Sequence, residues 1–207
     1  MRLHYHPLSS YSRKAAIGIG LRGDDIEMVT LNPFAGDLKC PEFLAASPFG
    51  KMPVLMGTPE GSISESTSIL EYLEERGPRV LLPLGQERRA RHFDRLADLY
   101  LLDPIGDYFW NKTDAVRTKC ETRLGQASAV WERELADGRP FICGDTITLG
   151  DLSAAIALHY AETEGVPVPG HMAAYRARLE ANPVLAASRD AAVPFVAMTL
   201  PRRQPAA

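Results

Sequence analysis

Pro53 restricts the fold of this chain more than any other residue, because it stands where a strand-like run begins. A proline has no backbone N–H and cannot donate to the central ladder of a sheet, so it needs a special position. A cis bond between Met52 and Pro53 would turn the Met52 backbone outward and leave its N–H and C=O groups to an extended ligand. The sequence therefore predicts a recognition point beside this proline.

Glu65 and Ser66 form a second recognition element, at the start of a predicted helix. This position supplies a carboxylate, a hydroxyl and the unpaired backbone N–H groups of the first helical turn. Together with the Met52 backbone, these groups would clamp a small peptide that carries both an ammonium and a carboxylate.

Composition and cysteine spacing narrow the class of protein. The chain has 207 residues, enough for one large or two small domains, and its net charge of −3 gives no reason to expect nucleic acid or an anionic membrane as partner. No apolar run approaches the roughly 18 residues of a membrane span, and residues 1–6 lack the apolar core of a signal peptide. Cys40, Cys120 and Cys143 are widely spaced, which argues against a disulfide framework or a zinc site. We expect a reduced, cytoplasmic protein without a metal.

The first part of the chain alternates strand-like and helix-like segments. The expected elements are a strand at 2–6, a helix at 12–21, a strand at 26–31, a short helix at 41–46, a hairpin of strands at 54–56 and 62–64, and a helix at 66–76. This order predicts a small mixed sheet covered by helices, an α/β domain.

Proline and glycine then interrupt the pattern at Pro78, Pro83 and Gly85, so we expect a first domain at 1–77, a linker at 78–86 and a second domain at 87–207. Helical periodicity dominates the second domain, which is predicted to be all-α. One apolar stripe runs over 93–104, where Pro104 is expected to kink the helix, and another over 120–131.

A capping box is predicted at the start of a later helix. Thr148 and Asp151 are spaced so that each side chain can reach the backbone N–H of the other residue. His159 falls on an apolar face of this helix and is expected to be a core residue. Two further short helices are expected at 175–181 and 184–191, and the tail after Pro194 is expected to be extended.

Four motifs together resemble the cytosolic glutathione S-transferase superfamily, in particular its bacterial, serine-type members of the theta, zeta and phi kinds. They are SSYSR at 9–13, SPFGKMPVL at 47–55, ESTSILEYL at 65–73 and TLGD at 148–151. The resemblance covers nearly the whole chain. It implies a thioredoxin-like N-terminal domain followed by an all-helical C-terminal domain, with glutathione as co-substrate, no metal, and a homodimer.

The resemblance also implies activation of the glutathione thiol. A free thiol has a pKa near 8.5, so a hydroxyl donor and a helix N-terminus aimed at the sulfur are needed to favour the thiolate. Ser9 matches the catalytic serine of serine-type members. Tyr5, which ends the first strand, is the competitor from tyrosine-type members, and Ser10 and Ser12 are further competitors. Ser12 is equally well explained as the N-cap of the first helix.

The glutathione contacts that the resemblance implies are Lys39, Lys51, Met52, Pro53, Glu65 and Ser66. Glu65 would meet the γ-glutamyl ammonium, and Ser66 would bind the adjacent carboxylate. Met52 would pair its main chain with the cysteinyl backbone, while Lys39 and Lys51 would face the glycyl carboxylate. A small hydrophobic electrophile would bind near Tyr108, Phe109 and Trp110, which an ordinary helical core would explain as well. The lysines are equally compatible with solvated surface charges.

Several functions stay open within this resemblance. The first is a transferase that joins glutathione to a soft electrophile, with roles in detoxification, in the catabolism of aromatic compounds or in peroxide reduction. A glutathione-dependent isomerase or disulfide reductase is an alternative, since residues 9–12 also resemble the Ser-Ser-Cys-Ser of the zeta class, with Tyr11 in place of the cysteine. A non-catalytic regulatory protein, comparable to the stringent starvation proteins, is the remaining hypothesis.

Overall fold

The computed structural model describes residues 1–199. The chain divides into two compact units, of which the first runs over Met1–Leu81 and the second begins at Leu82. The division falls inside the segment 78–86, where proline and glycine interrupt the sequence pattern. Each unit has its own elements and its own core.

A four-stranded mixed sheet forms the centre of the first unit, as predicted. Its strands are β1 (Arg2–Tyr5), β2 (Glu27–Thr30), β3 (Val54–Thr58) and β4 (Gly61–Ser64), in the order β2-β1-β3-β4. β1 is parallel to β2 and antiparallel to β3, and β3 is antiparallel to β4. The parallel pair requires a crossover, which α1 (Ser10–Arg22) supplies.

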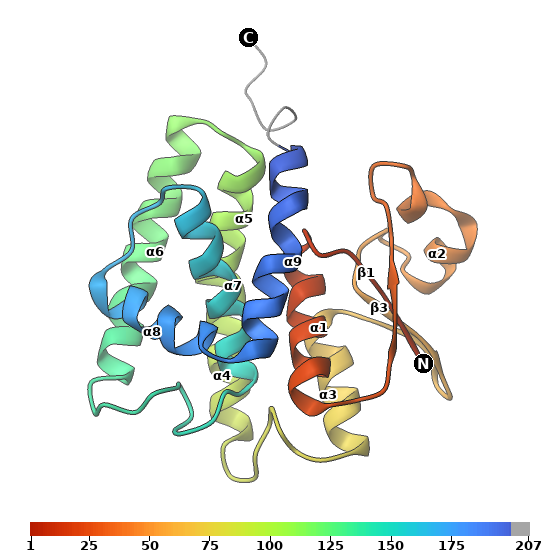
Figure 1. Cartoon of the computed structure of the whole chain (residues 1–207), viewed down its shortest axis with the longest axis horizontal. Coiled ribbons are helices and arrows are strands. Elements are labelled where there is room, and N and C mark those ends of the chain that lie inside the picture. The colour runs from red at the N-terminus through yellow and green to blue at the C-terminus, as the bar shows by residue number, and fades with distance from the viewer. Residues whose placement is uncertain (200–207) are drawn as a thin grey trace. The chain divides into compact units, whose positions relative to one another are not determined.

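Helices cover both faces of this sheet. Figure 1 shows α1 and α3 (Ser66–Arg76) side by side on one face, with α2 (Pro41–Ala46) on the other face, after a 3₁₀ turn at Asp37–Lys39. Successive side chains of β3 point to opposite faces of the sheet, so this strand can pack against helices on both faces. Val54 packs with Phe43 of α2, whereas Leu55, on the opposite face of the strand, is fully buried.

A buried ion pair connects the C-terminal ends of α1 and α3. Arg22 of α1 donates to the carboxylate of Glu74 on α3 and, at 2.8 Å, to the Leu73 carbonyl. Glu74 Oε1 also accepts the backbone N–H groups of Val80 and Leu81, at 3.2 and 3.0 Å. Residues 80–81 are therefore attached to the first unit by hydrogen bonds to α3.

The second unit is helical throughout its described elements. They are α4 (Glu87–Ala97), a π-helical turn (Asp98–Leu102), α5 (Asp103–Trp110), α6 (Asp114–Glu134), α7 (Leu149–Thr163), α8 (Gly170–Glu180) and α9 (Pro183–Thr199). Figure 1 shows α7 among the other helices of this unit, and every residue from 149 to 161 is buried, including His159 as predicted. In the part of the chain that the structure describes, no helix is long and apolar enough to cross a membrane.

Pro104, which was expected to kink the helix, lies beside a change in helix type. It stands in the first turn of α5, directly after the π-helical turn. Within this turn the Asp103 N–H donates to the carbonyl of Asp98, one residue further back than in an α-helix. The wider turn is one way to accommodate a proline that cannot donate its own hydrogen bond.

The predicted capping box is present at the start of α7. The fully buried Asp151 accepts the Thr148 N–H at 2.8 Å and the Ile142 N–H at 3.0 Å, and the Tyr175 hydroxyl donates to it as well. Burial raises the pKa of Asp151 above its ordinary value, although these donors oppose the shift. One carboxylate thereby connects α7, the loop before it and α8.

The expectation of an extended tail after Pro194 is wrong for residues 195–199, and the rest of that tail, 200–207, lies outside the described residues. α9 runs on through Pro194 to Thr199. A proline inside a helix loses one hydrogen bond and crowds the preceding turn, but tertiary packing can offset this cost. Leu185, Ala192 and Thr199 are buried along α9, and this packing is the physical reason that the local signal failed.

Candidate functional site

A cavity of about 240 Å³ lies in the first unit, where β3 begins and β4 meets α3. Its lining residues are Tyr11, Ser47, Phe49, Lys51, Met52, Pro53, Ser64, Glu65 and Ser66. Five of the six residues predicted to bind the peptide ligand thus line one cavity, and Lys39 is the exception. The two recognition elements found in the sequence therefore meet in space.

Met52 and Pro53 form one wall of the cavity. The peptide bond between them is cis, which is the case in which the Met52 backbone was expected to be left to a ligand. Pro53 is buried, and the strand that follows it pairs with β1 through Val54 and His4. Within residues 1–199, the Met52 backbone makes no hydrogen bond, so its N–H and C=O groups are available to a ligand.

Glu65 and Ser66, at the start of α3, line the cavity next to this wall, because Ser64 of β4 pairs with Val54 of β3. Glu65 has φ 71° and ψ 122°, a backbone conformation that costs a non-glycine residue about 1–3 kcal/mol. Such conformations cluster at functional sites. The Glu65 residue is exposed while Ser66 is 3% exposed. The first turn of α3 contains no acidic residue after the N-cap Glu65, and the positive end of the helix dipole favours an anion there.

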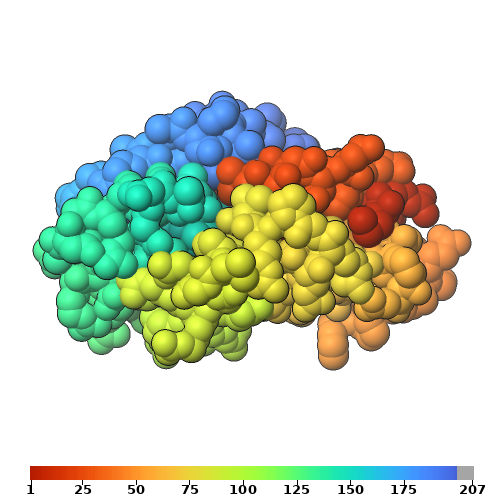
Figure 2. All heavy atoms as spheres, turned by 90° about the horizontal axis from the view of Figure 1, so that it is seen from below, coloured from red at the N-terminus to blue at the C-terminus, as the bar shows by residue number. Residues whose placement is uncertain are grey.

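A tight loop brings Lys51 and Phe49 to the cavity. The Ser47 hydroxyl donates to the Lys51 carbonyl at 2.7 Å and accepts the Lys51 N–H at 3.1 Å. Gly50 has φ 59°, and a Cβ there would lie 3.2 Å from the Leu38 carbonyl oxygen, so this turn requires glycine. Figure 2 shows the orange segment that contains α2 and this loop projecting from the first unit, and Phe49 is 86% exposed.

Ser9 lies at the start of α1, where the chain leaves β1. It is the N-cap residue, because its Oγ accepts the Ser12 N–H at 3.3 Å, and Ser12 is therefore not the cap. The Ser9 N–H donates to the His6 carbonyl at 3.0 Å. The nearly buried His6 accepts the Leu8 N–H on its Nδ1 at 3.0 Å, and burial lowers the pKa of its ring.

The other thiol-donor candidates are distributed around the same turn. Tyr5 ends β1 and Ser10 is the first residue of α1; both are half-buried. Ser12 is fully buried, and its Oγ has no hydrogen-bond partner among the described residues. Neither Ser9 nor any of these three lines the cavity, whereas Tyr11 does. Sequence reasoning noticed Tyr11 only as a departure from the zeta pattern and missed it as a lining residue.

Tyr108 and Trp110, which were predicted to contact an electrophile, differ from each other in solvent exposure and in the direction of their side chains. Tyr108 is 8% exposed, with Lys112 Nζ 4.0 Å from its ring centroid and Arg117 Nη1 3.5 Å from its hydroxyl. Trp110 is 46% exposed. Residues two apart on a helix do not share a face, so Tyr108 and Trp110 point to different sides of α5.

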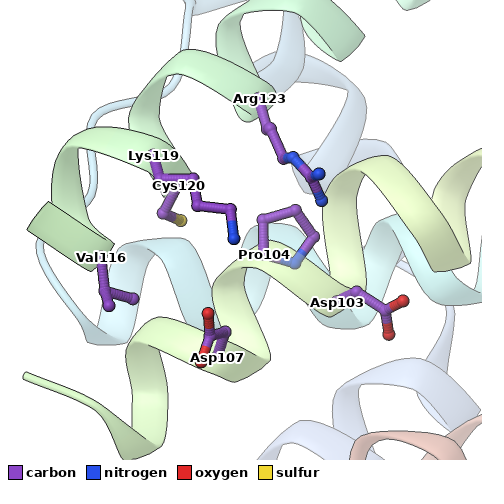
Figure 3. Close-up of a pocket in the computed structure, with 7 residues that line it drawn as sticks. All are labelled: Asp103, Pro104, Asp107, Val116, Lys119, Cys120 and Arg123. Carbon is purple, nitrogen blue, oxygen red and sulfur yellow. The ribbon is translucent and has the colours of Figure 1, made fainter.

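A second, smaller cavity of about 150 Å³ lies between α5 and α6. Figure 3 shows Asp103 and Asp107 of α5, Lys119 and Arg123 of α6, and the thiol of Cys120 around this cavity. Burial and the nearby carboxylates of Glu121 and Asp107 raise the pKa of Cys120 to about 11. The thiol is therefore protonated at neutral pH and is a poor nucleophile.

Metal ligands do not gather in the described residues, where no group of three or more His, Cys, Asp or Glu side chains could hold a metal ion. Cys40, Cys120 and Cys143 are all free. The first cavity brings together backbone groups, a helix N-terminus and two side-chain charges, which are groups that can hydrogen-bond a charged ligand.

Two family models match the chain. The model for "Glutathione S-transferase, N-terminal domain" matches residues 3–81, and that for "Glutathione S-transferase, C-terminal domain" matches residues 114–187. The chain is 31% identical to a zeta-class glutathione S-transferase of Euphorbia esula, over 79% of this chain and 76% of the relative. It is 29% identical to maleylacetoacetate isomerase of Pseudomonas aeruginosa, over 80% of this chain and 84% of the relative.

A solved structure has the same fold. Gtt2 of Saccharomyces cerevisiae superposes with a TM-score of 0.75 at 24% identity, and the match covers 91% of this chain and all of the Gtt2 chain. At this identity the likeness concerns the fold. The sheet order and the succession of helices described above are therefore a known arrangement.

Proposed function

Since the chain belongs to the glutathione S-transferase family, we propose that it binds glutathione in the cavity of the first unit and transfers it to a small hydrophobic electrophile. One observation carries the proposal. The cavity combines the unpaired Met52 backbone with the buried Ser66, which follows the positive-φ residue Glu65. An apolar ligand would use none of these groups.

The tripeptide has charges and backbone groups that match the cavity. The Glu65 carboxylate meets the γ-glutamyl ammonium, and the Ser66 N–H and hydroxyl donate to the γ-glutamyl carboxylate at the start of α3. Met52 exchanges backbone hydrogen bonds with the cysteinyl residue. Lys51 attracts the glycyl carboxylate, and Lys39 adds charge from the 3₁₀ turn outside the lining.

The reaction is an attack of the glutathione thiolate on a soft electrophile, without an enzyme-bound intermediate. The N-terminus of α1 and a hydroxyl from the segment 9–12 favour the thiolate over the thiol. Binding then places the sulfur next to the electrophile, and this proximity supplies much of the rate enhancement. We place the activity in the detoxification of such compounds in the cytoplasm, in keeping with three free cysteines.

A test of the binding site compares two serines of α3. Ser66→Ala removes a charge-assisted contact and should weaken glutathione binding by about 1.5–3 kcal/mol, measured by calorimetry. Ser68→Ala is the matched control, because Ser68 is exposed and does not line the cavity. Equal affinities in the two variants would refute the assigned site, and absence of binding by the unaltered protein would refute the function.

Isomerisation is the second candidate, because one relative is named maleylacetoacetate isomerase. In this reaction the glutathione sulfur adds to a cis double bond, the resulting single bond rotates, and elimination releases the trans product and glutathione. Glutathione is required but not consumed. The two functions are separated by measuring the glutathione concentration during turnover of a maleyl compound and of a halogenated nitroaromatic compound.

We also propose a homodimer in which the first unit of one chain faces the helical unit of its partner. Support comes from complementary charge: Arg88 and Arg95 are exposed and share a face of α4, and Glu75 of α3 has a side chain that is 70% exposed. Light scattering should give the mass of a dimer. Combined Arg88→Glu and Arg95→Glu substitutions should reduce it to that of a monomer, whereas Arg133→Glu on α6 should not.

A further inference from the structure

Tyr11 is the contribution of α1 to the ligand cavity. Among the residues that line this cavity in the described part of the chain, it alone comes from the segment between β1 and β2. The remaining lining residues come from the loop before β3, from the end of β4 and from the start of α3. Tyr11 therefore faces the ligand from the helix whose N-terminus is expected to lie nearest the thiol.

The position of Tyr11 in α1 explains why its side chain reaches the cavity. Ser9 is the N-cap and Ser10 the first helical residue, so Tyr11 is the second. A helical side chain leans toward the N-terminus of its helix and covers the preceding turn. This lean is expected to carry the long phenol of Tyr11 toward the start of α1, whereas the short side chain of Ser9 accepts the Ser12 N–H.

The other hydroxyl groups of the cavity have different roles. The Ser47 hydroxyl both donates to and accepts from the Lys51 backbone. Ser66 is the proposed donor to the γ-glutamyl carboxylate, and Ser64 ends β4 beside Glu65. Tyr11 adds a further side-chain hydroxyl group to the residues that line the cavity.

The chemistry of a phenol suits a thiolate partner. A tyrosine hydroxyl has an ordinary pKa of about 10, close to the value of about 8.5 for a thiol, so it is a strong donor that keeps its own proton. A hydrogen bond to an anion is about twice as strong as one between neutral groups.

On these grounds we propose that the Tyr11 hydroxyl donates a hydrogen bond to the thiolate of bound glutathione, and that Tyr11 rather than Ser9 is the catalytic hydroxyl. The inference rests on the proposed glutathione site. The thiol proton leaves to solvent, the phenol retains its proton, and the sulfur electron pair forms the new bond to the electrophile. In a substitution the leaving group departs with the electron pair of the broken bond, and in an addition the electron pair of the opened double bond takes a proton from solvent. Tyr5 and Ser12 play no part in this step.

The experiment measures the thiol pKa of bound glutathione from the ultraviolet absorbance of the thiolate as a function of pH. Tyr11→Phe keeps the ring and should raise this pKa by about one unit, which means about tenfold less thiolate below the pKa. Ser9→Ala should shift it less. Tyr72→Phe is the control, because Tyr72 is buried in α3 away from the cavity. Affinity for S-methylglutathione, which has no thiol, should be unchanged in Tyr11→Phe and shows that the site is intact.

The outcomes separate the inference from the function on which it rests. A larger shift in Tyr11→Phe than in Ser9→Ala supports the inference. An equal or larger shift in Ser9→Ala, or no shift in Tyr11→Phe, overturns it while the glutathione site stands. Failure of the unaltered protein to bind either glutathione or S-methylglutathione overturns the proposed function and the inference together.

Discussion

The buried ion pair between Arg22 and Glu74 should be the largest single polar contribution to the stability of the first unit. The side chains are 1% and 3% exposed. Replacing Glu74 with alanine leaves the Arg22 guanidinium with Asp24 as its remaining acidic partner at 2.6 Å. It also removes the acceptor of the Val80 and Leu81 N–H groups.

The expected loss follows from these contacts. Breaking a buried pair by removing one partner costs about 3–5 kcal/mol, because a desolvated charge is left behind. Asp24 compensates part of this cost, whereas each orphaned N–H adds about 1 kcal/mol or more. We therefore expect Glu74→Ala to lose about 3–5 kcal/mol, a large share of the roughly 5–15 kcal/mol that stabilises a typical domain. Glu74→Gln retains an acceptor oxygen and should lose less unfolding free energy than Glu74→Ala.

The assay is urea unfolding followed by far-ultraviolet circular dichroism, which reports both units. Tryptophan fluorescence reports the second unit alone, because Trp110 and Trp131 are the two tryptophans of the chain. Arg76→Met is the matched control. Arg76 also lies on α3, but its ion pair with Glu60 is exposed and should contribute at most about 1 kcal/mol to the unfolding free energy. A Glu74→Ala protein within about 1 kcal/mol of the unaltered one would refute the reasoning.

Three further predictions concern packing, pH and thiol reactivity. Gly150→Ala should lower the unfolding free energy by about 1–3 kcal/mol, measured by urea titration, since a Cβ there would lie 3.0 Å from the Phe93 Cβ. The depressed pKa of His6 means that its contribution to stability is present above pH 6.5 and is lost as pH falls through the folded-state pKa. His6→Asn, which can keep an acceptor for the Leu8 N–H, should show a flatter pH dependence of unfolding. Cys120 should react with an alkylating reagent at neutral pH far more slowly in the folded than in the unfolded protein, as mass spectrometry can show, because its folded pKa is about 11.

Most elements of the first unit could be predicted because their signals are local. The helices at Pro41–Ala46 and Ser66–Arg76 have the predicted bounds, and the capping box at Thr148 forms as expected. Each depends on residues a few positions apart, whose hydrogen bonds are decided by short-range geometry. Pro194 shows the limit of such signals, since helix α9 continues past it.

The sequence by itself determined the recognition groups of this protein: the Met52 backbone before Pro53, and the Glu65–Ser66 step at a helix start. The tertiary structure decided which hydroxyl joins them. The helix expected to begin at Ser12 begins at Ser10, so Tyr11 belongs to its first turn and not to the loop before it. The packing that brings the start of α1 to the residues before β3 and at the start of α3 depends on contacts between distant segments, so no local pattern predicts that Tyr11 lines the cavity.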